Sequence, residues 1–389
     1  ITPTLDRPVY LAGFGQNRRA ESVHDELFVR ALALEQGGAR QVMVGLDLIG
    51  LGRQHCQQIE RRIDEESPGA QLFLACTHTH HGPDTIGLWG PDMMTSGVDS
   101  GYLSGLKDRI VSTALAALAE AQPAQLRHAS LPVSGLAKNN RDPEIVDEEL
   151  TCLQFCCAET SVPLATWLIY PCHPEVLSDQ NPHITSDYPD SLRRAVEAET
   201  DAPCLFMSGA IGGMMTPDVE EHSFAEAKQM GRTLAQAALG ALSEAAAQPV
   251  ERLAYYRQEY AIPMTNPLFR MAMEAGLLPN RLDEDGTITT EANLLKIGPA
   301  WILGVPGELL PKLGLEFKRV MQQAGAGTAA VAGLTNDELG YILPQEDYAY
   351  PENPFEPGEH YEETMSIGPE AGPRLRRALQ QLIRAGEAE

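Results

Sequence analysis

The sequence predicts an α/β protein with a mixed, largely parallel sheet flanked by helices. Short, continuous apolar segments alternate along the chain with longer segments of helical periodicity. Continuous apolar segments are typical of strands buried on both faces, as in parallel sheets, and the helices between them provide the crossover connections. Residues 255–264 and 287–297 alternate apolar and polar side chains instead, which predicts an antiparallel extension of the sheet.

The predicted elements follow one another in a regular order. Apolar segments such as QVMVGLD and CLFMS predict strands, and apolar residues spaced three and four positions apart predict helices. The segment 346–363, rich in Pro, Tyr and Glu, predicts a long ordered loop. Strands are expected at residues 41–47, 71–76, 164–170, 204–208, 301–305 and 328–334, and helices at residues 53–64, 102–121, 188–198, 224–246 and 310–323.

The sequence lacks the two features that would indicate several repeats or domains. No internal repeat of fixed period is visible, and no low-complexity linker divides the chain. Because domain boundaries usually fall in such linkers, one compact domain covering residues 1–389 is expected.

The charge of the chain limits its partners. Lys and Arg number 29 against 54 Asp and Glu, so the formal net charge is -25. Binding to nucleic acid or to an anionic membrane requires a positive surface. Neither is therefore expected as a main partner, and no apolar stretch approaches the length of a membrane span. A small-molecule or lipid-like substrate remains, and the sequence gives no prediction of oligomeric state.

The cysteine content favours a reducing compartment. The chain has seven cysteines, several of them within apolar segments, and no CxxC pair. This pattern is typical of small buried hydrophobic residues rather than of disulfides or a cysteine zinc site. A cytoplasmic location is therefore expected. A secreted or periplasmic location stays open, because the sequence starts at Ile1 rather than at Met.

Polar side chains follow four of the predicted strands, at the point where each strand ends. In open α/β sheets, ligands bind outside the carboxyl ends of the strands. Four separate segments thus direct polar groups to one edge, and their agreement is the evidence for a site. These groups are His78 and His80, then His173, then Glu308, and finally Asn336 and Tyr341.

The segment THTHHGPD, residues 77–84, holds three histidines in four positions. Alternate residues of an extended chain face the same side, so His78 and His80 are expected to face one site and His81 to face away. Imidazole nitrogens oriented by a second-shell acceptor are frequent metal ligands. The alternative is a polar loop with surface histidines, which the adjacent buried strand disfavours. The spacing does not match HExxH.

Each remaining candidate also has a structural interpretation. Considered alone, His173 beside Pro174 is more typical of a satisfied core histidine, and Tyr341 of ordinary packing. Glu308 in VPGEL equally suits a carboxylate near a helix N-terminus. The segment GAIGG, residues 209–213, lacks a phosphate-loop pattern and predicts a tight turn that lets backbone approach the site. No GxSxG nucleophile motif occurs in the chain.

Six segments together resemble the neutral/alkaline non-lysosomal ceramidase family in its N-terminal catalytic region. THTHHGPD is similar to the family's THTHSGPGG, GVPGELLPKLG to its PGE segment, and IYPCHPEVLSDQNPHITSDY to its HPT…SGD segment. GLTNDELGYILPQEDY and HYEETMSIGP resemble its NxYxxY…EEY and YEGAST segments. SGAIGGMMTPD lies where the family has a GDVSPN-type loop. The motifs occur in the same order from residue 1 to about residue 373.

The resemblance implies one catalytic Zn²⁺ per chain and a role for each matching residue. His80 would transfer a proton or bind the substrate carbonyl. Arg141 in NNRDP would lie near the scissile group, and Tyr361 in HYEET would help to stabilise the transition state. The implied zinc ligands are His78, His173, Glu308 and Tyr341.

The chain also departs from the family pattern. Thr216 stands where the family has its proposed serine nucleophile, Met214 replaces the preceding Asp, and Asp218 the following Asn. His81 replaces a serine, and an insertion lies between residues 348 and 361. The family's C-terminal immunoglobulin-like domain is expected to be absent. These departures argue against ceramide as the substrate.

The sequence thus predicts a zinc-dependent hydrolase in which metal-bound water attacks the carbonyl of an amide, an N-acyl substrate. Thr216 would then line the site without acting as a nucleophile. A zinc hydrolase of an ester, lactone or sugar-linked substrate is one alternative. A non-catalytic metal- or ligand-binding protein is the other.

Overall fold

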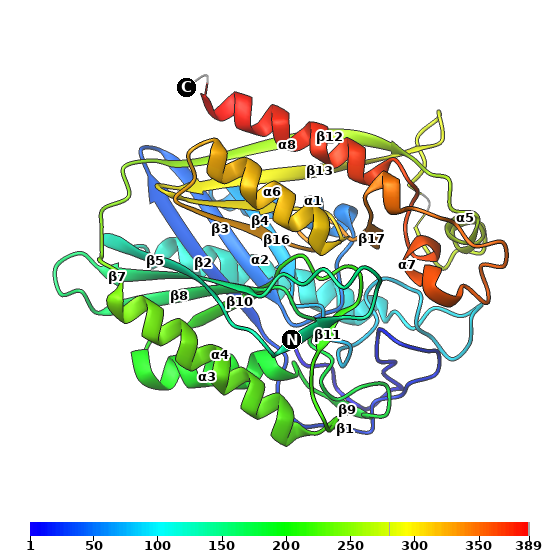
Figure 1. Ribbon diagram of the computed structural model, residues 1–389. Helices are drawn as coiled ribbons and strands as arrows, with labels where there is room; N and C mark the ends of the chain where they lie inside the picture. Colours follow the sequence, from blue (N-terminus) through cyan, green and yellow to red (C-terminus); the bar gives the residue numbers. More distant parts are fainter. Residues whose placement is uncertain (280, 388–389) are drawn as a thin grey trace.

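Three larger sheets form the body of the protein in the computed structural model, which describes residues 1–279 and 281–387 (Figure 1). The first sheet has the order β2 (Val29–Gln36), β3 (Ala39–Leu46), β4 (Ala70–Cys76). The second has the order β10 (Cys204–Ser208), β8 (Pro163–Tyr170), β7 (Glu149–Cys157), β5 (Ala124–Pro132). The third has the order β12 (Leu253–Pro263), β13 (Thr287–Ile297), β14 (Ala300–Gly304), β16 (Thr328–Ala332).

Helices cover the outer side of each sheet. In Figure 1, α6 (Pro311–Gln323) and α8 (Ala371–Glu387) lie over the third sheet at the top, and α3 (Tyr188–Thr200) and α4 (Phe224–Glu244) lie under the second at the bottom. The first sheet packs against α1 (Arg53–Glu66) and α2 (Ser100–Ala119). None of the described helices combines the length and the apolar character needed to cross a membrane.

Shorter elements surround the ends of these sheets. They are α5 (Pro267–Glu274), α7 (Tyr361–Thr364) and the 3₁₀ turns η1 (Gln345–Asp347) and η2 (Gly358–His360). Three two-stranded sheets complete the fold, β1 (Ser22–Val23) with β9 (His183–Ile184), β6 (Ala137–Asn139) with β11 (Met215–Pro217), and β15 (Glu308–Leu309) with β17 (Tyr341–Ile342).

The sheets are mixed but not largely parallel, so that part of the predicted fold class is wrong. In the three larger sheets only the pairs β3–β4, β8–β10 and β14–β16 are parallel, and the other pairs are antiparallel. Strand β7 shows the reason, because it is almost wholly buried yet antiparallel to both neighbours. A continuous apolar segment reports burial on both faces, and packing between sheets and helices produces this burial regardless of strand direction.

One structural unit occurs three times, although the sequence shows no repeat. Each unit has an antiparallel strand pair, then a helix, then a strand parallel to the second of the pair. The units are β2–β3–α1–β4, β7–β8–α3–β10 and β13–β14–α6–β16. The loops and insertions between the units differ in length, which removes any fixed period from the sequence.

The inner faces of the three sheets share one apolar core. Phe73 from the first sheet meets Trp167 from the second edge-on, with ring centroids 6.0 Å apart. Leu295, Ile302 and Ala330 from the third sheet belong to the same cluster and are buried. Aromatic pairs of this kind add about 0.5–1.5 kcal/mol beyond the burial of their area. This core fixes the sheets relative to one another and so brings their strand ends together.

Most strands and helices that the sequence predicts are present within a few residues of the expected bounds. Residues 255–264 and 287–297 form the antiparallel pair β12–β13, as predicted. The segment 346–363 is mainly loop, with short helical turns at its ends. The seven cysteines are free, and all except Cys157 are buried, as their apolar surroundings indicated. Strands β2, β5 and β7 and helices α5 and α8 are present but were not predicted from the sequence.

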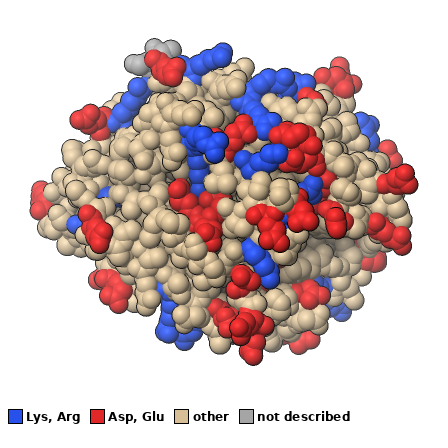
Figure 2. Space-filling view, in the orientation of Figure 1, with Lys and Arg blue, Asp and Glu red and all other residues tan. Residues whose placement is uncertain are grey.

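The distribution of charged side chains on the surface agrees with the acidic composition of the chain. On the face shown in Figure 2, basic side chains are interspersed with acidic ones. With a formal net charge of -25, this face offers no purely basic surface for a polyanion.

Candidate metal centre

Each of the three repeated units contributes one polar side chain to a common buried site. His78 lies two residues beyond the end of β4, and His173 lies three residues beyond the end of β8. Glu308 begins β15, four residues beyond the end of β14. All three side chains are buried. The prediction that separate strand ends direct polar groups to one place is confirmed for these residues.

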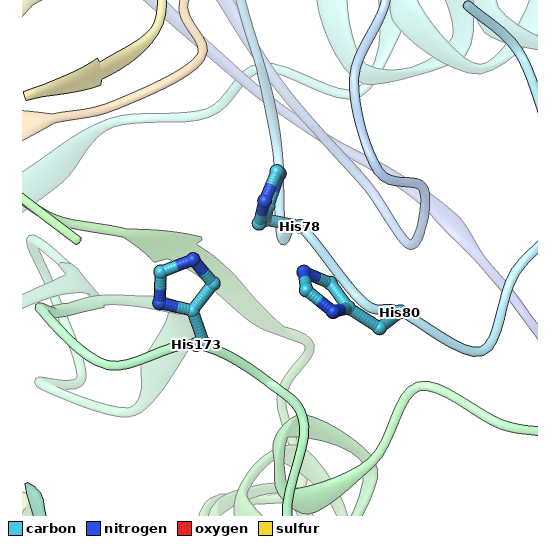
Figure 3. A group of neighbouring side chains, drawn as sticks. All are labelled: His78, His80 and His173. Atoms are coloured by element: carbon cyan, nitrogen blue, oxygen red, sulfur yellow. The ribbon is translucent and has the colours of Figure 1, made fainter. Parts of the chain in front are cut away.

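Three histidines form the centre of this site. The potential ligand nitrogens of His78, His80 and His173 lie within 4.8 Å of one another. The ring centroid of His78 lies 5.0 Å from that of His80 and 5.1 Å from that of His173. Figure 3 shows the three rings converging on one space, with His78 and His80 on one chain segment and His173 opposite. His78 and His80 therefore face the same site, as predicted, although His78 has a φ of +66° and the segment is not a regular extended strand.

Two of the rings are oriented by backbone carbonyls. His78 Nδ1 lies 2.5 Å from the carbonyl oxygen of Ile49, and His173 Nδ1 lies 2.8 Å from that of Met215. Each Nδ1 can therefore donate its proton to the backbone, which leaves Nε2 as the free nitrogen. Both Nε2 atoms face Glu308 Oε2, at 3.5 Å from His78 and 3.0 Å from His173. This arrangement is typical of metal-binding histidines.

His80 has no hydrogen-bond partner at either ring nitrogen among the described residues, although the ring is buried. Its Nδ1 lies 3.2 Å from Oε2 of the buried Glu175, without the alignment of a hydrogen bond. Phe14 packs edge-on against the ring with centroids 4.6 Å apart. A Cβ on Gly13, which has a φ of +76°, would lie 2.5 Å from the ring. The N-terminal segment thus closes over His80, and only glycine allows this approach.

The buried charges shift the pKa values of these groups in different directions. Burial lowers the pKa of His78 to about 4 and that of His80 well below its usual range. Burial acts in the same direction on His173, but Glu175 and Glu308 outweigh it and raise its pKa to about 9. Burial acts to raise the pKa of Glu308, yet the two neighbouring histidines lower it. In the absence of a metal, the site therefore holds carboxylates beside histidines of which two are neutral.

Backbone strain and close packing also occur at the site. His78 has a φ of +66°, a conformation that non-glycine residues rarely adopt and that is often found at functional sites. A Cβ on Gly212 would lie 2.5 Å from the carbonyl oxygen of Glu308. Gly212 also donates its backbone N–H to Leu309. The expectation that the GAIGG turn lets backbone approach the site is therefore met.

Two tyrosines, Tyr341 and Tyr361, also belong to the site. Tyr341 is buried, and a hydrogen bond from it acts to lower the pKa of Glu308. Its hydroxyl also lies 3.3 Å from Sδ of Met214. Tyr361 is 41% exposed and its ring centroid lies 6.1 Å from that of Tyr341. Both tyrosines line the same cavity as His78, His80 and Glu308.

Arg141 is engaged by two carboxylates. Its guanidinium donates to Oε2 of Glu362 at 2.7 Å and to Oε1 of Glu363 at 2.8 Å. Both acidic residues are buried and directly follow Tyr361 in α7. The structure therefore ties Arg141 to the segment that carries Tyr361, and its predicted action on the scissile group stays a prediction.

Thr216 lies in strand β11 directly after Met215, whose carbonyl oxygen contacts Nδ1 of His173. A hydrogen bond from Thr216 acts to lower the pKa of Glu175, the carboxylate next to His80. Glu175 was not among the residues expected from the sequence. It comes to the site because it lies two residues after His173, in a turn where its backbone N–H donates to the carbonyl oxygen of His173 at 3.0 Å.

Asn336 and His81 do not join the cluster. The Asn336 side chain accepts from Leu74 N at 2.9 Å and donates to Glu291 Oε1 at 3.1 Å, so it braces β4. His81 Nε2 lies 3.6 Å from Asp187 Oδ2, and its ring is buried away from the three converging histidines.

The residues present fit a divalent metal ion. The fit rests on buried imidazole nitrogens without partners at His80 and on two Nε2 atoms that face one carboxylate. Buried polar groups normally have partners, so this cluster lacks one. A set of imidazole nitrogens and a carboxylate suits zinc.

A small cavity gives access to the centre. Its volume is about 90 Å³, and its walls include both polar groups of the site and apolar side chains. Aromatic rings from distant segments contribute to the wall, namely Phe14, Trp89, Phe269, Tyr341 and Tyr361. Sites for small organic molecules commonly combine such apolar walls with a few polar groups.

Known proteins match this chain through their structures. No protein-family model matches it, and no curated protein matches it in sequence. Neutral ceramidase from Pseudomonas aeruginosa matches with a TM-score of 0.78 and 19% identity, over 97% of this chain and 71% of that chain. A ceramidase complexed with C2 matches with a TM-score of 0.80 and 18% identity, over 98% of this chain and 73% of that chain. The fold is therefore that of neutral ceramidase, as the sequence motifs predicted.

Proposed function

We propose that this chain is a zinc-dependent hydrolase that cleaves the amide bond of an N-acyl substrate, a small molecule or lipid-like compound. The observation that carries the proposal is the buried group of His78, His80 and His173 beside Glu308, reached through a cavity. The likeness in fold to proteins named ceramidases supports the choice of an amide, because ceramide is an N-acyl compound.

The proposed ligands are His78, His173, Glu308 and Tyr341. A zinc ion bound there would polarise the substrate carbonyl and lower the pKa of water to about 7. The carbonyls of Ile49 and Met215 would hold the Nδ1 protons of the two histidines and keep each Nε2 directed inward.

His80 would handle the proton that the reaction moves. Its Nδ1 is close to Glu175, so the carboxylate would stabilise a positive charge on the ring. Its Nε2 would take a proton from the attacking water and pass it to the leaving nitrogen. Because Thr216 is hydrogen-bonded to Glu175, it would hold this carboxylate in place rather than attack the substrate.

Tyr361 would stabilise the negative charge that develops on the carbonyl oxygen. Its exposed side chain lines the cavity, where a hydroxyl donor is available to a bound substrate. Arg141 would act as a positioning residue, because its bonds to Glu362 and Glu363 hold the helical turn that begins at Tyr361.

Metal analysis combined with a panel of acyl substrates tests this function. The purified protein should contain close to one zinc ion per chain and should cleave N-acyl substrates faster than matched O-acyl ones. Long-chain ceramide should be cleaved weakly or not at all, because residues around Thr216 depart from the ceramidase pattern. Cleavage of O-acyl substrates alone would contradict the amide assignment, and full zinc content without any turnover would favour a binding protein.

A further inference from the structure

Two cavities meet beside the candidate metal centre. The small cavity at the histidines adjoins a larger one of about 340 Å³, lined mostly by apolar side chains of α5 and its neighbours. Both cavities share a wall made by Ile86, Phe269, Leu278, Glu338 and Leu339. Four of these shared residues are apolar, so Glu338 is the ionisable group of the shared wall, and burial together with the nearby Glu308 raises its pKa well above the usual range.

Neighbouring backbone groups hold the Glu338 side chain in place. Its Oε1 accepts the backbone N–H of Gly340 at 2.8 Å. A Cβ on Gly50 would lie 2.7 Å from Cγ of Glu338, so the absence of a side chain at residue 50 makes room for the carboxylate. Its Oε2 is buried and has no hydrogen-bond partner among the described residues. One oxygen is thus fixed, and the other has no partner among the described residues, in a side chain that lines both cavities.

The surrounding charges indicate what this oxygen would bind. The described side chains that line the small cavity include two carboxylates, Glu308 and Glu338, but no lysine or arginine. Arg281 lines the larger cavity, but both carboxylate oxygens of Asp337 accept hydrogen bonds from it. A ligand group with a hydrogen-bond donor or a positive charge is therefore favoured next to Glu338, and an anionic group is disfavoured.

We propose that Glu338 binds a hydroxyl or protonated amine located next to the scissile carbonyl, on an acyl chain that enters the larger apolar cavity. This proposal rests on the proposed function, because it takes the carbonyl to lie at the histidines. It narrows the substrate class to N-acyl compounds whose acyl group carries a donor. The unpartnered Oε2 receives that donor, and the apolar walls on both sides receive the chain.

Kinetics with matched substrates test the proposal. The probes are para-nitroanilides of α-amino-octanoic, α-hydroxy-octanoic and plain octanoic acid. The wild-type protein should cleave the donor-bearing probes with higher kcat/KM than the plain one. Glu338→Leu should lower kcat/KM for both donor-bearing probes by roughly 10- to 100-fold, as expected when a buried hydrogen-bond donor of the probe loses its acceptor. The plain probe should change by less than about threefold, at equal zinc content.

Three further variants separate recognition from general damage. Glu338→Gln keeps an acceptor and should retain most of the activity on the hydroxyl probe while losing activity on the amino probe. Gly50→Ala should reduce donor selectivity with the carboxyl group still present, because its Cβ displaces the Glu338 side chain. Glu356→Gln, on the exposed loop, is the control and should leave selectivity unchanged. An equal loss by Glu338→Leu on all three probes would overturn the proposal.

Binding distinguishes this proposal from the proposed hydrolase activity. The three corresponding octanamides can be titrated calorimetrically into the zinc-loaded protein, where no turnover is needed. Tighter binding of the amino and hydroxy amides, lost in Glu338→Leu, would support the subsite even if no probe were cleaved. Cleavage of probes without any donor preference in binding or kinetics would leave the hydrolase intact and overturn the role of Glu338.

Discussion

The Asp337 cluster and the histidine cluster are both buried, but their polar atoms differ in the number of their partners. Asp337 accepts two hydrogen bonds from Arg281, at 2.8 and 2.7 Å, and further ones from Thr290 and the backbone N–H groups of Arg53 and Glu338. In the histidine cluster, both ring nitrogens of His80 lack partners among the described residues.

This difference separates a structural polar cluster from a site. Burial of a charge costs free energy unless partners compensate for it. At Asp337 the fold supplies these partners itself, from segments far apart in the chain. At the histidines, both ring nitrogens of His80 lack partners among the described residues, and the potential ligand nitrogens of the three rings lie within 4.8 Å of one another. The partner of His80 must then come from outside the chain, and a metal ion held by the neighbouring ligands would bring a bound water or substrate group next to this ring.

Breaking the Asp337 cluster should have the largest effect, and on stability. Asp337→Asn removes the charge that faces Arg281 and leaves a mostly buried guanidinium without its counter-ion. We expect the free energy of unfolding to fall by about 3–5 kcal/mol. Denaturant unfolding measures this loss. Zinc bound per folded chain should stay unchanged, and the double variant Asp337→Asn/Arg281→Met should recover part of the stability. A fall in zinc content at full stability would instead show that Asp337 supports metal binding rather than the stability of the fold.

Breaking the histidine cluster should act on metal affinity instead. His173→Ala removes one proposed ligand and the ring next to Glu308. Loss of even an outer-shell partner lowers metal affinity by 10- to 100-fold, so we expect a loss of at least about 100-fold, or about 2.7 kcal/mol. Competition with a chromogenic chelator measures the affinity. The metal-free variant should also unfold more easily than metal-free wild type, because His173 is buried and paired with Glu308, so the affinity is compared between the folded proteins. Full zinc content in the variant would exclude His173 as a ligand.

Thr216→Ala should have the smallest effect and sharpens the comparison within the site. If Thr216 only holds Glu175, the variant loses one hydrogen bond, about 1 kcal/mol or roughly fivefold in rate. His80→Ala, which removes the proposed proton carrier, should lower the rate by about 100-fold or more. Steady-state rates on one working substrate, at equal zinc content, measure both. A fully metallated but inactive Thr216→Ala protein would indicate that Thr216 is the nucleophile.

The amino-acid sequence by itself determined the local elements and the positions of the polar residues. Apolar periodicity located the strand at residues 204–208 and the helix that ends at Gln323, because these patterns depend on neighbouring residues alone. Alternation along THTHHGPD placed His78 and His80 on one side. The order of the motifs indicated the ceramidase fold.

Only the tertiary structure decided strand direction and the partners of each side chain. His173 meets Glu308 across 135 residues of sequence, and Arg141 meets Glu362 across 221. Glu175 and Glu338 acquired their places in the same way, one beside His80 and one between two cavities. Periodicity reports only that a segment is buried. Which segments meet depends on the packing of three sheets around a shared core, and that packing is a property of the whole chain.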